Sequence, residues 1–423
     1  MSDNSYVLVI NCGSSSLKFS LIAPLTGEAI IDGLAERLMT DSAEITFKHY
    51  LITVSQEDTK EKEVEQFILK TPFDHKTAIE QLVETLTRKQ LIDKISAIGH
   101  RVVHGGEQYS QPTLITPEVK NTITELSKLA PLHNPANLIG IEAAQHAFIN
   151  LPQVAIFDTA FHQTMPEKAY MYALPYSLYQ QNSVRKYGFH GTSHYFVSQM
   201  AAKKINKPIV QCNFISAHLG NGCSVTAVKN GESVDSSMGF TPLEGVMMGT
   251  RSGSIDPGII FYLVEQLNYT LDEVNQLLNK KSGLLGLSQL SNDCRTLEQA
   301  AIESGDSDKS RLAKLALTVF CYQIAKSIAS FSASLTSLDA LIFTGGIGEN
   351  SSFIREQIIT HLSLLNFQLD PTLNQSTKLG KSGNICCDNS RLCLIIPTNE
   401  EWVIAEQAFS HIQQLKQENP YVS

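Results

Sequence analysis

Three stretches of the chain share one pattern, in which a short apolar run ends in glycines and small polar residues. NFISA leads into the turn HLGNG, His218 to Gly222, and VTAV follows shortly after it. Val7 to Ile10 and Leu17 to Ile22 flank the small-residue turn NCGSSS, and Ala340 to Phe343 leads into TGGIG. Short apolar runs bounded by glycine are typical of buried strands. The pattern therefore predicts two strand–turn–strand hairpins and one strand–turn–helix segment.

Two more apolar runs, Ile95 to Ile98 and Val154 to Phe157, predict strands that end in polar residues. Arg101 follows the first run and Asp158 the second, and the later run RLCLII ends shortly before Glu400. Charged side chains directly after a buried strand mark the usual place for a site in an open α/β sheet. A structural salt bridge for Arg101 and a turn cap for Asp158 are the alternatives.

Apolar residues at helical spacing predict a helix over Thr77 to Arg88 and a long helix from Asp308 to about Leu335. Asp256 and Pro257 have the pattern of an N-cap and a first helical residue, for a helix that extends through Leu267. The expected core face of the long helix consists of Leu312, Leu315, Val319, Tyr322 and Ala325.

Composition narrows the class of protein. A chain of 423 residues predicts two domains, and 43% hydrophobic with 18% charged residues describe a globular, enzyme-like chain. No apolar run reaches the roughly 18 residues that a membrane span requires. The start, MSDNSYVLVI, lacks a basic region, so we expect a strand there and no signal peptide. The polar segment from Asp41 to Lys70 predicts peripheral strands and loops.

Charge and cysteine content exclude further classes. The formal net charge of −9 argues against a general nucleic-acid surface, which would be basic. The eight cysteines show neither C-x-x-C pairs nor zinc spacing, which predicts a reduced, cytoplasmic protein. An acidic chain that binds an anion must do so with local donors and a metal.

The glycine turns are candidate phosphate sites, because glycine permits close ligand approach and a tight turn directs several N–H groups toward one point. Lys18 lies just past the first turn, and a helix N-terminus follows the third. Plain hairpin turns are the alternative, and the imperfect match to G-x-G-x-x-G makes a dinucleotide site a weak interpretation. Two similar hairpins far apart suggest two similar domains facing a cleft, the plan of the sugar kinase, actin and heat-shock ATPase superfamily.

Two further candidates lie between the hairpins. RKYGFHGTSH contains His190, which is either a buried, hydrogen-bonded histidine or a donor to a transition state. Arg251 lies in a long glycine-rich segment, and such segments in compact domains are usually functional or disordered; the Met, Phe and Leu content argues against disorder. The chain contains neither a P-loop nor the protein-kinase motifs.

These motifs combine into a resemblance that covers essentially the whole chain. In order, the segments are NCGSSSLKF, GHRVVHGGE, PLHNPAN, FDTAFHQTMP, GFHGTSH, HLGNG, MGTRSGSIDPG, SNDCR, FTGGIGEN and PTNEE. Together they resemble the acetate kinase family of short-chain carboxylate kinases. The resemblance implies an α/β fold of two RNase-H-like domains, as in the actin and sugar-kinase superfamily, around a nucleotide cleft. Residues 1–157 with 400–423 would form the first domain and residues 158–399 the second.

The resemblance also implies an activity. The enzyme would reversibly transfer the γ-phosphoryl group of ATP to acetate, giving acetyl phosphate and ADP by direct in-line transfer. Mg²⁺ is the implied cofactor, with Mn²⁺ as the alternative. The implied partners are ATP/ADP, acetate/acetyl phosphate and a second copy of the chain bound through the second domain, with no nucleic acid and no membrane.

Motif by motif, the resemblance implies roles for individual residues. The implied catalytic residues are Arg101, Asp158, His190 and Arg251. The implied acetate-binding residues are Arg101, Val103 and Leu132, and the implied metal ligands are Asn11 and Glu400. The implied nucleotide-binding residues are Lys18, His218, Leu219, Gly220, Asn221, Gly222, Asp293, Cys294, Arg295, Gly345, Gly346, Ile347, Gly348, Glu349 and Asn350.

The chemistry itself bears on the role of Asp158. An acceptor carboxylate, with a pKa of roughly 4 to 5, is already ionised at pH 7 and needs no general base. Catalysis of phosphoryl transfer rests mainly on positioning and electrostatics, which arginines, a histidine and a metal can provide. We therefore expect Asp158 to orient the metal, its waters or an arginine and not to transfer a proton.

Two alternative functions stay open at this point. Propionate or butyrate kinase is the alternative within the enzyme class, with Val103 as a candidate wall residue, because one methylene is worth only about 1–3 kcal/mol. A non-enzymatic, actin-like ATP-binding module is the alternative from another class. The cluster of Arg101, Asp158, His190 and Arg251 argues against it, because a nucleotide sensor needs no carboxylate-gripping site.

Overall fold

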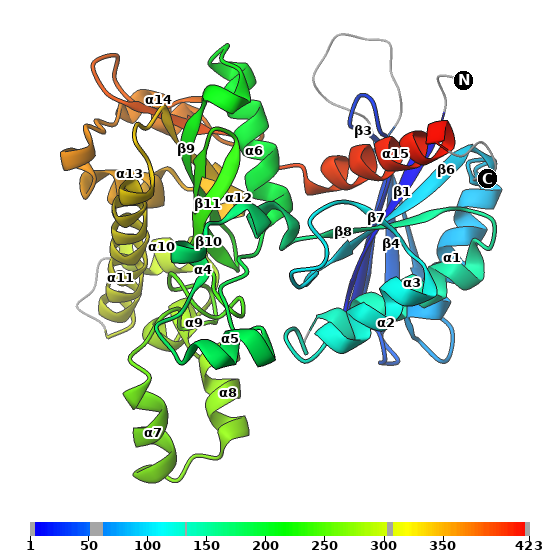
Figure 1. The fold of residues 1–423 in the computed structure, drawn as a ribbon, viewed down its shortest axis with the longest axis horizontal. Helices are drawn as coiled ribbons and strands as arrows, with labels where there is room; N and C mark the ends of the chain where they lie inside the picture. Colours follow the sequence, from blue (N-terminus) through cyan, green and yellow to red (C-terminus); the bar gives the residue numbers. More distant parts are fainter. Residues whose placement is uncertain (1–4, 51–61, 132, 303–307, 419–423) are drawn as a thin grey trace. The chain divides into compact units, whose positions relative to one another are not determined.

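The strands of the protein form two mixed sheets, one in each of two units (Figure 1). This computed structural model describes residues 5–50, 62–131, 133–302 and 308–418. Unit 1 comprises Met1–Ala160 and Asn399–Ser423, and unit 2 comprises Phe161–Thr398. The C-terminal segment therefore returns to the unit in which the chain begins.

The sheet of unit 1 is built around the first strand of the chain. β1 pairs antiparallel with β2 on one side and parallel with β6 on the other, and β6 pairs parallel with β8. The order across the sheet is β5-β4-β3-β2-β1-β6-β8-β7. The strands are β1 (Tyr6–Gly13), β2 (Ser16–Ala23), β3 (Glu28–Glu36), β4 (Glu44–Tyr50), β5 (Lys62–Ile68), β6 (Ile95–Val102), β7 (Thr113–Leu114) and β8 (Gln153–Phe157).

The sheet of unit 2 repeats this arrangement. β9 pairs antiparallel with β10 and parallel with β12, and β12 pairs parallel with β14. The order β11-β10-β9-β12-β14 thus corresponds to β3-β2-β1-β6-β8 of unit 1, and β13 is added at the edge. The strands are β9 (Asn213–Leu219), β10 (Cys223–Lys229), β11 (Glu232–Ser236), β12 (Ala340–Thr344), β13 (Gly383–Asn384) and β14 (Leu392–Ile395).

Helices cover both faces of the sheet in unit 1 (Figure 1). Leu8 and Ile10 of β1 belong to a core that includes residues of α1 and α3, whereas Val7 and Val9 belong to a second core with α15. Because side chains alternate along a strand, β1 can be apolar throughout and fill both layers. The helices are α1 (His75–Arg88), α2 (Pro117–Leu126), α3 (Asn134–Ala147) and α15 (Glu400–Glu418).

The C-terminal helix α15 approaches the sheet closely. At Gly99 of β6, a Cβ atom would lie 2.6 Å from the Cγ2 atom of Ile404, so only glycine leaves room for the helix. At the start of α15, Trp402 donates its indole N–H to the carbonyl of Pro24 at 3.0 Å. These contacts hold the residues around Glu400 against the sheet of unit 1.

In unit 2, helices α6 and α11 pack against the sheet strands, α6 on β9 and β12 and α11 on β9 and β10. The short helix α12 also packs on β9 and β12, and α7 and α8 project from the rest of unit 2 (Figure 1). The helices are α4 (Glu167–Tyr170), α5 (Tyr176–Asn182), α6 (Gly191–Lys204), α7 (Gly258–Glu265), α8 (Leu271–Lys280), α9 (Gly283–Ser288), α10 (Cys294–Ile302), α11 (Asp308–Phe331), α12 (Gly345–Asn350), α13 (Ser352–Thr360) and α14 (Pro371–Ser376).

The predicted core face of α11 is wrong. Leu315 and Tyr322 are 44% and 51% exposed, and only Ala325 of the five predicted residues is buried. The helix carries a second, broader apolar stripe, and that stripe packs on the sheet and the neighbouring helices. Its buried members include Ala313, Ala316, Leu317, Phe320, Cys321, Ile324 and Ile328.

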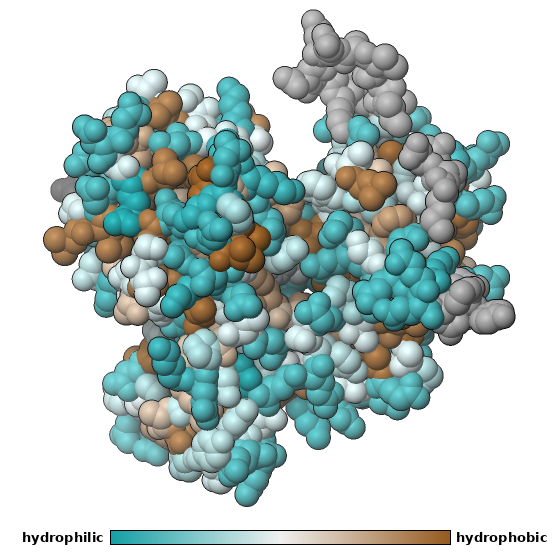
Figure 2. All heavy atoms as spheres, turned by 45° about the horizontal axis from the view of Figure 1, so that its top comes forward, coloured by the Kyte–Doolittle hydropathy of each residue, from teal (hydrophilic) through white to brown (hydrophobic). Residues whose placement is uncertain are grey.

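The segment over residues 308–334 is, among the described residues, a helix long and apolar enough to cross a membrane by length and composition alone. In this structure α11 packs against β9, β10 and several helices of unit 2, so its apolar stripe is covered by protein. The face of the molecule drawn in Figure 2 is mostly hydrophilic, and its apolar side chains lie in separate patches.

Three predicted element boundaries differ from the structure. The first turn is shorter than NCGSSS, because β1 extends to Gly13 and β2 begins at Ser16. The helix predicted from Asp256 through Leu267 is α7, which spans Gly258–Glu265. The third glycine turn is itself a short helix, α12, and Ser351 caps the next helix by accepting from the Ile354 N–H at 3.0 Å. Residues 51–61 of the predicted peripheral segment lie outside the described residues.

We expect the free energy of unfolding to fall as the pH decreases from about 6.5 to 4. Burial lowers the pKa of His100 and of His104 to about 4, and that of His194 well below its usual value. Below the ordinary pKa near 6.5, the unfolded chain therefore binds protons that the folded chain does not, and folded-state stability is lost. The difference is worth about 3 kcal/mol each for His100 and His104 at the acid end. Urea unfolding between about pH 7.5 and 4.5 measures this slope.

A pair of variants separates the buried histidines from the exposed ones. His100 bonds Gln153 at 2.8 Å, and His100→Gln keeps an amide there that does not titrate, so the slope should flatten. The matched control is His146→Gln, because His146 is exposed. Identical acid slopes in His100→Gln and the parent protein would contradict the prediction.

Candidate active site

In unit 1, strand register brings several predicted site residues to one edge of the sheet. Asn11 lies directly opposite Lys18 in the β1–β2 pair. Along the parallel pairs, Ile10 lies beside His100 and Arg101 beside Ile156. The residues that follow these positions, among them Asp158, therefore emerge at the same end of the strands, where sites of open α/β sheets form.

Arg101 is held in place by two neighbours. Its Nη2 atom donates to Oδ2 of Asp158, and its Nη1 atom lies 3.5 Å from Oδ1 of Asn11. The Asp158 side chain is 1% exposed, so the pair is largely desolvated. Burial works against the guanidinium charge, but the Asp158, Glu400 and Glu401 carboxylates outweigh it and raise the pKa of Arg101. The arginine therefore stays charged, with its plane fixed by the aspartate.

The Arg101 side chain keeps bonding capacity beyond these two contacts. Its Nε atom is buried and has no hydrogen-bond partner among the described residues. A buried N–H without a partner costs free energy, so a ligand that supplies an acceptor at this point would be stabilised. Carboxylate and phosphate oxygens are the acceptors that a guanidinium binds in bidentate fashion.

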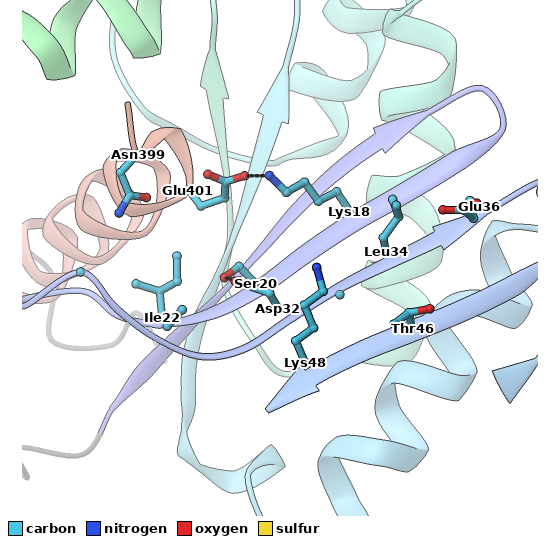
Figure 3. Close-up of a pocket in the computed structure, with 13 residues that line it drawn as sticks. Lys18, Ser20, Ile22, Asp32, Leu34, Glu36, Thr46, Lys48, Asn399 and Glu401 are labelled. Carbon is cyan, nitrogen blue, oxygen red and sulfur yellow. Dashed lines mark hydrogen bonds and ion pairs between the residues drawn. The ribbon is translucent and has the colours of Figure 1, made fainter. Parts of the chain in front are cut away.

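Glu400 and Glu401 form the first turn of α15 and face the same region. Burial raises the pKa of the Glu400 carboxyl to about 7, the Asp158 and Glu401 carboxylates act in the same direction, and Arg101 opposes them. Glu401 pairs with the Lys18 Nζ atom (Figure 3). This ion pair borders a cavity of about 540 Å³ on the β2–β4 face, which Asp32 and Lys48 also line.

Oxygen donors for a divalent cation are present in this cluster. Asn11 offers an amide oxygen and Glu400 a carboxylate that lies in an anionic, buried setting, which a cation would stabilise. Within the described ranges there is no group of three or more His, Cys, Asp or Glu side chains placed to hold a metal. Two protein oxygens fit a divalent cation that keeps several waters and completes its coordination with substrate phosphates.

Two asparagines of the motif PLHNPAN support the site, a role that the sequence analysis missed. Asn137 accepts from the Val103 N–H at 3.1 Å and donates to the Cys12 carbonyl at 2.9 Å. Asn134 accepts from the N–H of His104 at 3.1 Å. They join the loop after β6 to the first turn of the chain. Val103 is 5% exposed, and the other predicted wall residue, Leu132, lies outside the described residues.

In unit 2, His190 and Arg251 lie next to Gly222, in the turn between β9 and β10. We call this β9–β10 pair the central hairpin. A Cβ atom at Gly222 would lie 3.3 Å from Nε2 of His190 and 3.8 Å from Nη1 of Arg251, so both side chains pack close to this glycine. His190 has a left-handed backbone, with φ of 55°, directly before α6. Left-handed backbone at a non-glycine residue is uncommon and clusters at functional sites.

The charge of Arg251 has little local compensation. Its Nη1 atom donates to the carbonyl of Pro242 at 3.0 Å and lies 3.8 Å from the sulfur of Met248. No ion pair with a carboxylate occurs at Arg251 in the part of the chain that the structure describes. Burial lowers the pKa of its guanidinium, which means that the cation is held at an energetic cost. An anion bound next to Gly222 would offset that cost.

A cavity of about 660 Å³ brings together three of the predicted nucleotide-binding segments. Its predicted members are Gly220, Asn221, Asp293, Cys294, Arg295, Gly346, Ile347 and Asn350. Arg295 is exposed at its mouth and pairs with Asp293 at 2.8 Å. Glu298 also lines the cavity, bonded to Ser351 at 2.6 Å, although no motif pointed to it.

The remaining predicted nucleotide residues of unit 2 are not among those that line this cavity, and several of them hold the neighbouring turns together. A Cβ atom at Gly345 would lie 2.7 Å from the carbonyl oxygen of Leu219, so this glycine lets α12 approach the hairpin. The Glu349 carboxylate accepts from the N–H groups of Gly345 at 2.9 Å and Thr398 at 3.1 Å. His218 bonds Ser193 at 2.8 Å. These contacts fix the shape of the turns.

Comparisons with known proteins match this architecture along its whole length. A model of the acetokinase family matches residues 6–406. An acetate kinase from Shewanella woodyi is 53% identical over 407 residues, which cover 96% of this chain and 98% of that protein. A solved propionate kinase from Francisella tularensis is 44% identical with a TM-score of 0.88, and the acetate kinase of Porphyromonas gingivalis is 39% identical with a TM-score of 0.86. Each alignment covers 96% of this chain and 99% of the other. The predicted two-domain α/β fold is thereby confirmed.

Proposed function

The chain belongs to the acetokinase family, and on that premise we propose which of its groups carry out the reaction. The protein is a kinase that transfers a phosphoryl group from ATP to acetate. The family works with a divalent metal bound to ATP. The observation that supports our assignment best is the fixed, charged Arg101, whose buried Nε atom has no partner among the described residues.

The reaction needs no proton transfer. An oxygen of the ionised acetate carboxylate forms a bond to the γ-phosphorus, the bond from that phosphorus to the β–γ bridging oxygen breaks, and ADP leaves with the electron pair. Negative charge spreads over the transferred group on the way. The protein must therefore bring two anions together and stabilise the negative charge that develops. Hydrogen-bond donors and cations that are already in position can do this.

In unit 1, we propose that Arg101 binds the acetate carboxylate through the side of its guanidinium that Asp158 and Asn11 leave available. Val103, in the loop after β6, would form part of the wall beside the methyl group. Leu132 would complete that wall, as the family resemblance implies. Asp158 orients the guanidinium through their direct ion pair, which suits one of the roles expected for it: holding an arginine.

Mg²⁺ is the metal that we propose, with Mn²⁺ as the alternative. Asn11 and Glu400 would hold it, directly or through its waters, and when bound it would neutralise charge on the phosphate oxygens. The buried Glu400 carboxylate, beside Asp158 and Glu401, supports a cation at this place. Lys18 would contact the nucleotide phosphates, exchanging its exposed pairing with Glu401 for them.

In unit 2, the cavity lined by the three nucleotide-binding segments supports ATP/ADP binding, with Asp293 to Arg295 at its mouth. His190 and Arg251 would stabilise the transferring phosphoryl group, because both lie next to the glycine turn at Gly222. An arginine whose charge lacks a local carboxylate partner is well suited to an anionic transition state.

The function is tested by acyl phosphate formation, trapped as hydroxamate, with acetate, propionate and butyrate side by side. We expect ATP- and metal-dependent product and the highest kcat/KM with acetate.

Arg251→Ala should lower kcat by about 10²–10³-fold, as for other lost transition-state donors, whereas Arg311→Ala, which removes an exposed arginine paired with Asp308, should not. Full activity of Arg251→Ala would refute its role.

Propionate kinase is the second candidate, and the 44% identity to the propionate kinase of Francisella tularensis favours it. One methylene changes binding by only about 1–3 kcal/mol, so some turnover of propionate is expected in either case. A higher kcat/KM with propionate than with acetate would keep the mechanism and change the substrate.

Asp158→Asn tests whether Asp158 positions Arg101 or transfers a proton. The variant loses the charge that fixes the guanidinium, so we expect kcat to fall while the shape of the pH profile is unchanged. Measuring kcat/KM for acetate across pH in both proteins provides the comparison. The loss of one ionisation limb in the variant would instead assign a proton-transfer role to Asp158.

We also propose that the protein forms a homodimer through α7 of unit 2. This helix, GIIFYLVE, has no buried residue, and Ile259, Phe261 and Tyr262 are 45%, 63% and 57% exposed. Leu271 of α8 is 70% exposed nearby. Apolar surface of this kind on a folded protein usually marks an interface, and most oligomers of identical chains are two-fold dimers.

Phe261→Asp should shift the protein from a dimer toward the 46.6 kDa monomer in sedimentation velocity. Leu364→Asp is the matched control, because Leu364 is a leucine of the same unit that is 99% exposed away from α7. A monomeric parent protein, or a Phe261→Asp variant that remains dimeric, would contradict this assignment.

A cytoplasmic location is our inference from the eight free cysteines.

A further inference from the structure

A chain of buried hydrogen bonds runs behind His190 in unit 2. Nδ1 of His190 lies 2.9 Å from the hydroxyl of Ser224, and the same hydroxyl lies 2.7 Å from Nε2 of His194. Nδ1 of His194 in turn lies 2.7 Å from the hydroxyl of Ser216. Ser216, Ser224 and His194 are all 0% exposed, so these hydrogen bonds are shielded from bulk solvent.

The fold brings these residues together from three elements. His190 precedes α6 and His194 is one helical turn further on, so both rings project from the same side of the helix. Ser216 belongs to β9 and Ser224 to β10, and α6 packs on the sheet at β9. The line of contacts is therefore built into the packing of α6 on the central hairpin.

Proton counting links the states of the members. A serine hydroxyl has one proton, and a neutral imidazole has one N–H. Complete burial, with His162 and His218 nearby, lowers the pKa of His194 far below its usual value, so this ring is neutral. If Nε2–H of His194 donates to Ser224, the hydroxyl proton of Ser224 has Nδ1 of His190 as its one acceptor among the described residues, and it donates there. Neutral His190 then has its proton on Nε2.

The opposite arrangement would disable His190 as a donor while it is neutral. Ser224 would donate to His194 and accept from Nδ1–H of His190, leaving Nε2 without a proton. A Cβ atom at Gly222 would lie 3.3 Å from both Nε2 and Cε1 of His190, so Nε2 lies on the edge of the ring that faces the glycine turn. A negatively charged phosphoryl group at that point needs an N–H donor and would be repelled by a nitrogen lone pair.

We propose that Ser224 and His194 are positioning residues that hold His190 as the tautomer with its proton on Nε2, directed at the glycine turn. This inference rests on the proposed role of His190 in phosphoryl transfer. Histidine ligands and bases elsewhere are oriented by the partner of their second nitrogen, and Ser224 is that partner here. His194 acts one step further away by determining which way the Ser224 hydroxyl points.

The first test is the ¹⁵N NMR spectrum of the parent protein with labelled histidine, in which His190→Gln identifies the His190 ring. The ring nitrogens of a neutral histidine differ strongly in chemical shift according to which one carries the proton. We expect a protonated Nε2 and an unprotonated Nδ1 at His190. The reverse assignment would overturn the proposal, and only the assignment variant has to fold.

Ser224→Ala then removes the link. We expect a mixture of His190 tautomers and a kcat about 10–100-fold lower, as for other lost orienting partners, with KM for ATP and acetate within about twofold of the parent, since neither substrate contact is removed. Ser224→Thr, which keeps the hydroxyl, should recover most of kcat. Thr226→Val is the matched control, because Thr226 is an equally buried hydroxyl of β10 that bonds Ser236 instead.

The outcomes are distinct. Unchanged His190 shifts in Ser224→Ala, or a kcat no lower than that of Thr226→Val, would overturn the positioning role. If the parent protein formed no acyl phosphate from any acid, the proposed function would fail, and the NMR spectra would still decide the tautomer.

Discussion

In both units one strand runs antiparallel to its hairpin partner and parallel to the strand on its other side, and the register of these pairs sets where the functional side chains stand. In unit 1, β1 aligns Asn11 with Lys18, and β6 places Arg101 beside the end of β8. In unit 2, the β9–β10 pair sets His218 opposite Ser224. A slip of one residue in either hairpin would turn these side chains to the other face of the sheet.

Burial makes the charges of this protein effective and also costly. Arg101 and Asp158 compensate each other in a largely buried pair, whereas the Arg251 guanidinium contacts a carbonyl oxygen and a sulfur atom and pairs with no carboxylate among the described residues. Glu400 is the converse case, a carboxylate raised in pKa by burial and by two neighbouring acids. A buried charge without its counterion is unfavourable in the free protein. Anionic substrates and a cation would supply the missing partners. Binding them would remove the unfavourable energy of the unpaired charges and so stabilise the bound state and the transition state.

Hydrogen bonds from other polar side chains hold these charged groups and the turns around them in position. Asn134 and Asn137 tie the loop after β6 to the rest of unit 1, and Glu349 closes the third glycine turn against Thr398. Ser224 and His194 form the corresponding chain of hydrogen bonds to the ring of His190. Each of these groups is satisfied by a partner far away in the sequence, and each would leave a buried donor or acceptor unpaired if removed.

The sequence alone determined much about this protein. Apolar runs ending in glycine predicted both hairpins, and the order of motifs identified the family, because ten segments in the same order along the chain are far more specific than any one of them. It did not determine which stripe of α11 is buried: Leu315 and Tyr322 fit helical periodicity as well as the true core residues, and only the surfaces packed against the helix select between them. Nor could it pair Asn137 with Cys12, or Ser224 with two histidines, since hydrogen bonds between distant residues leave no local pattern. Residue types and their spacing therefore predict which chemical groups a segment provides. Which of these groups contact one another is decided by the tertiary structure, because packing and strand register bring distant residues together.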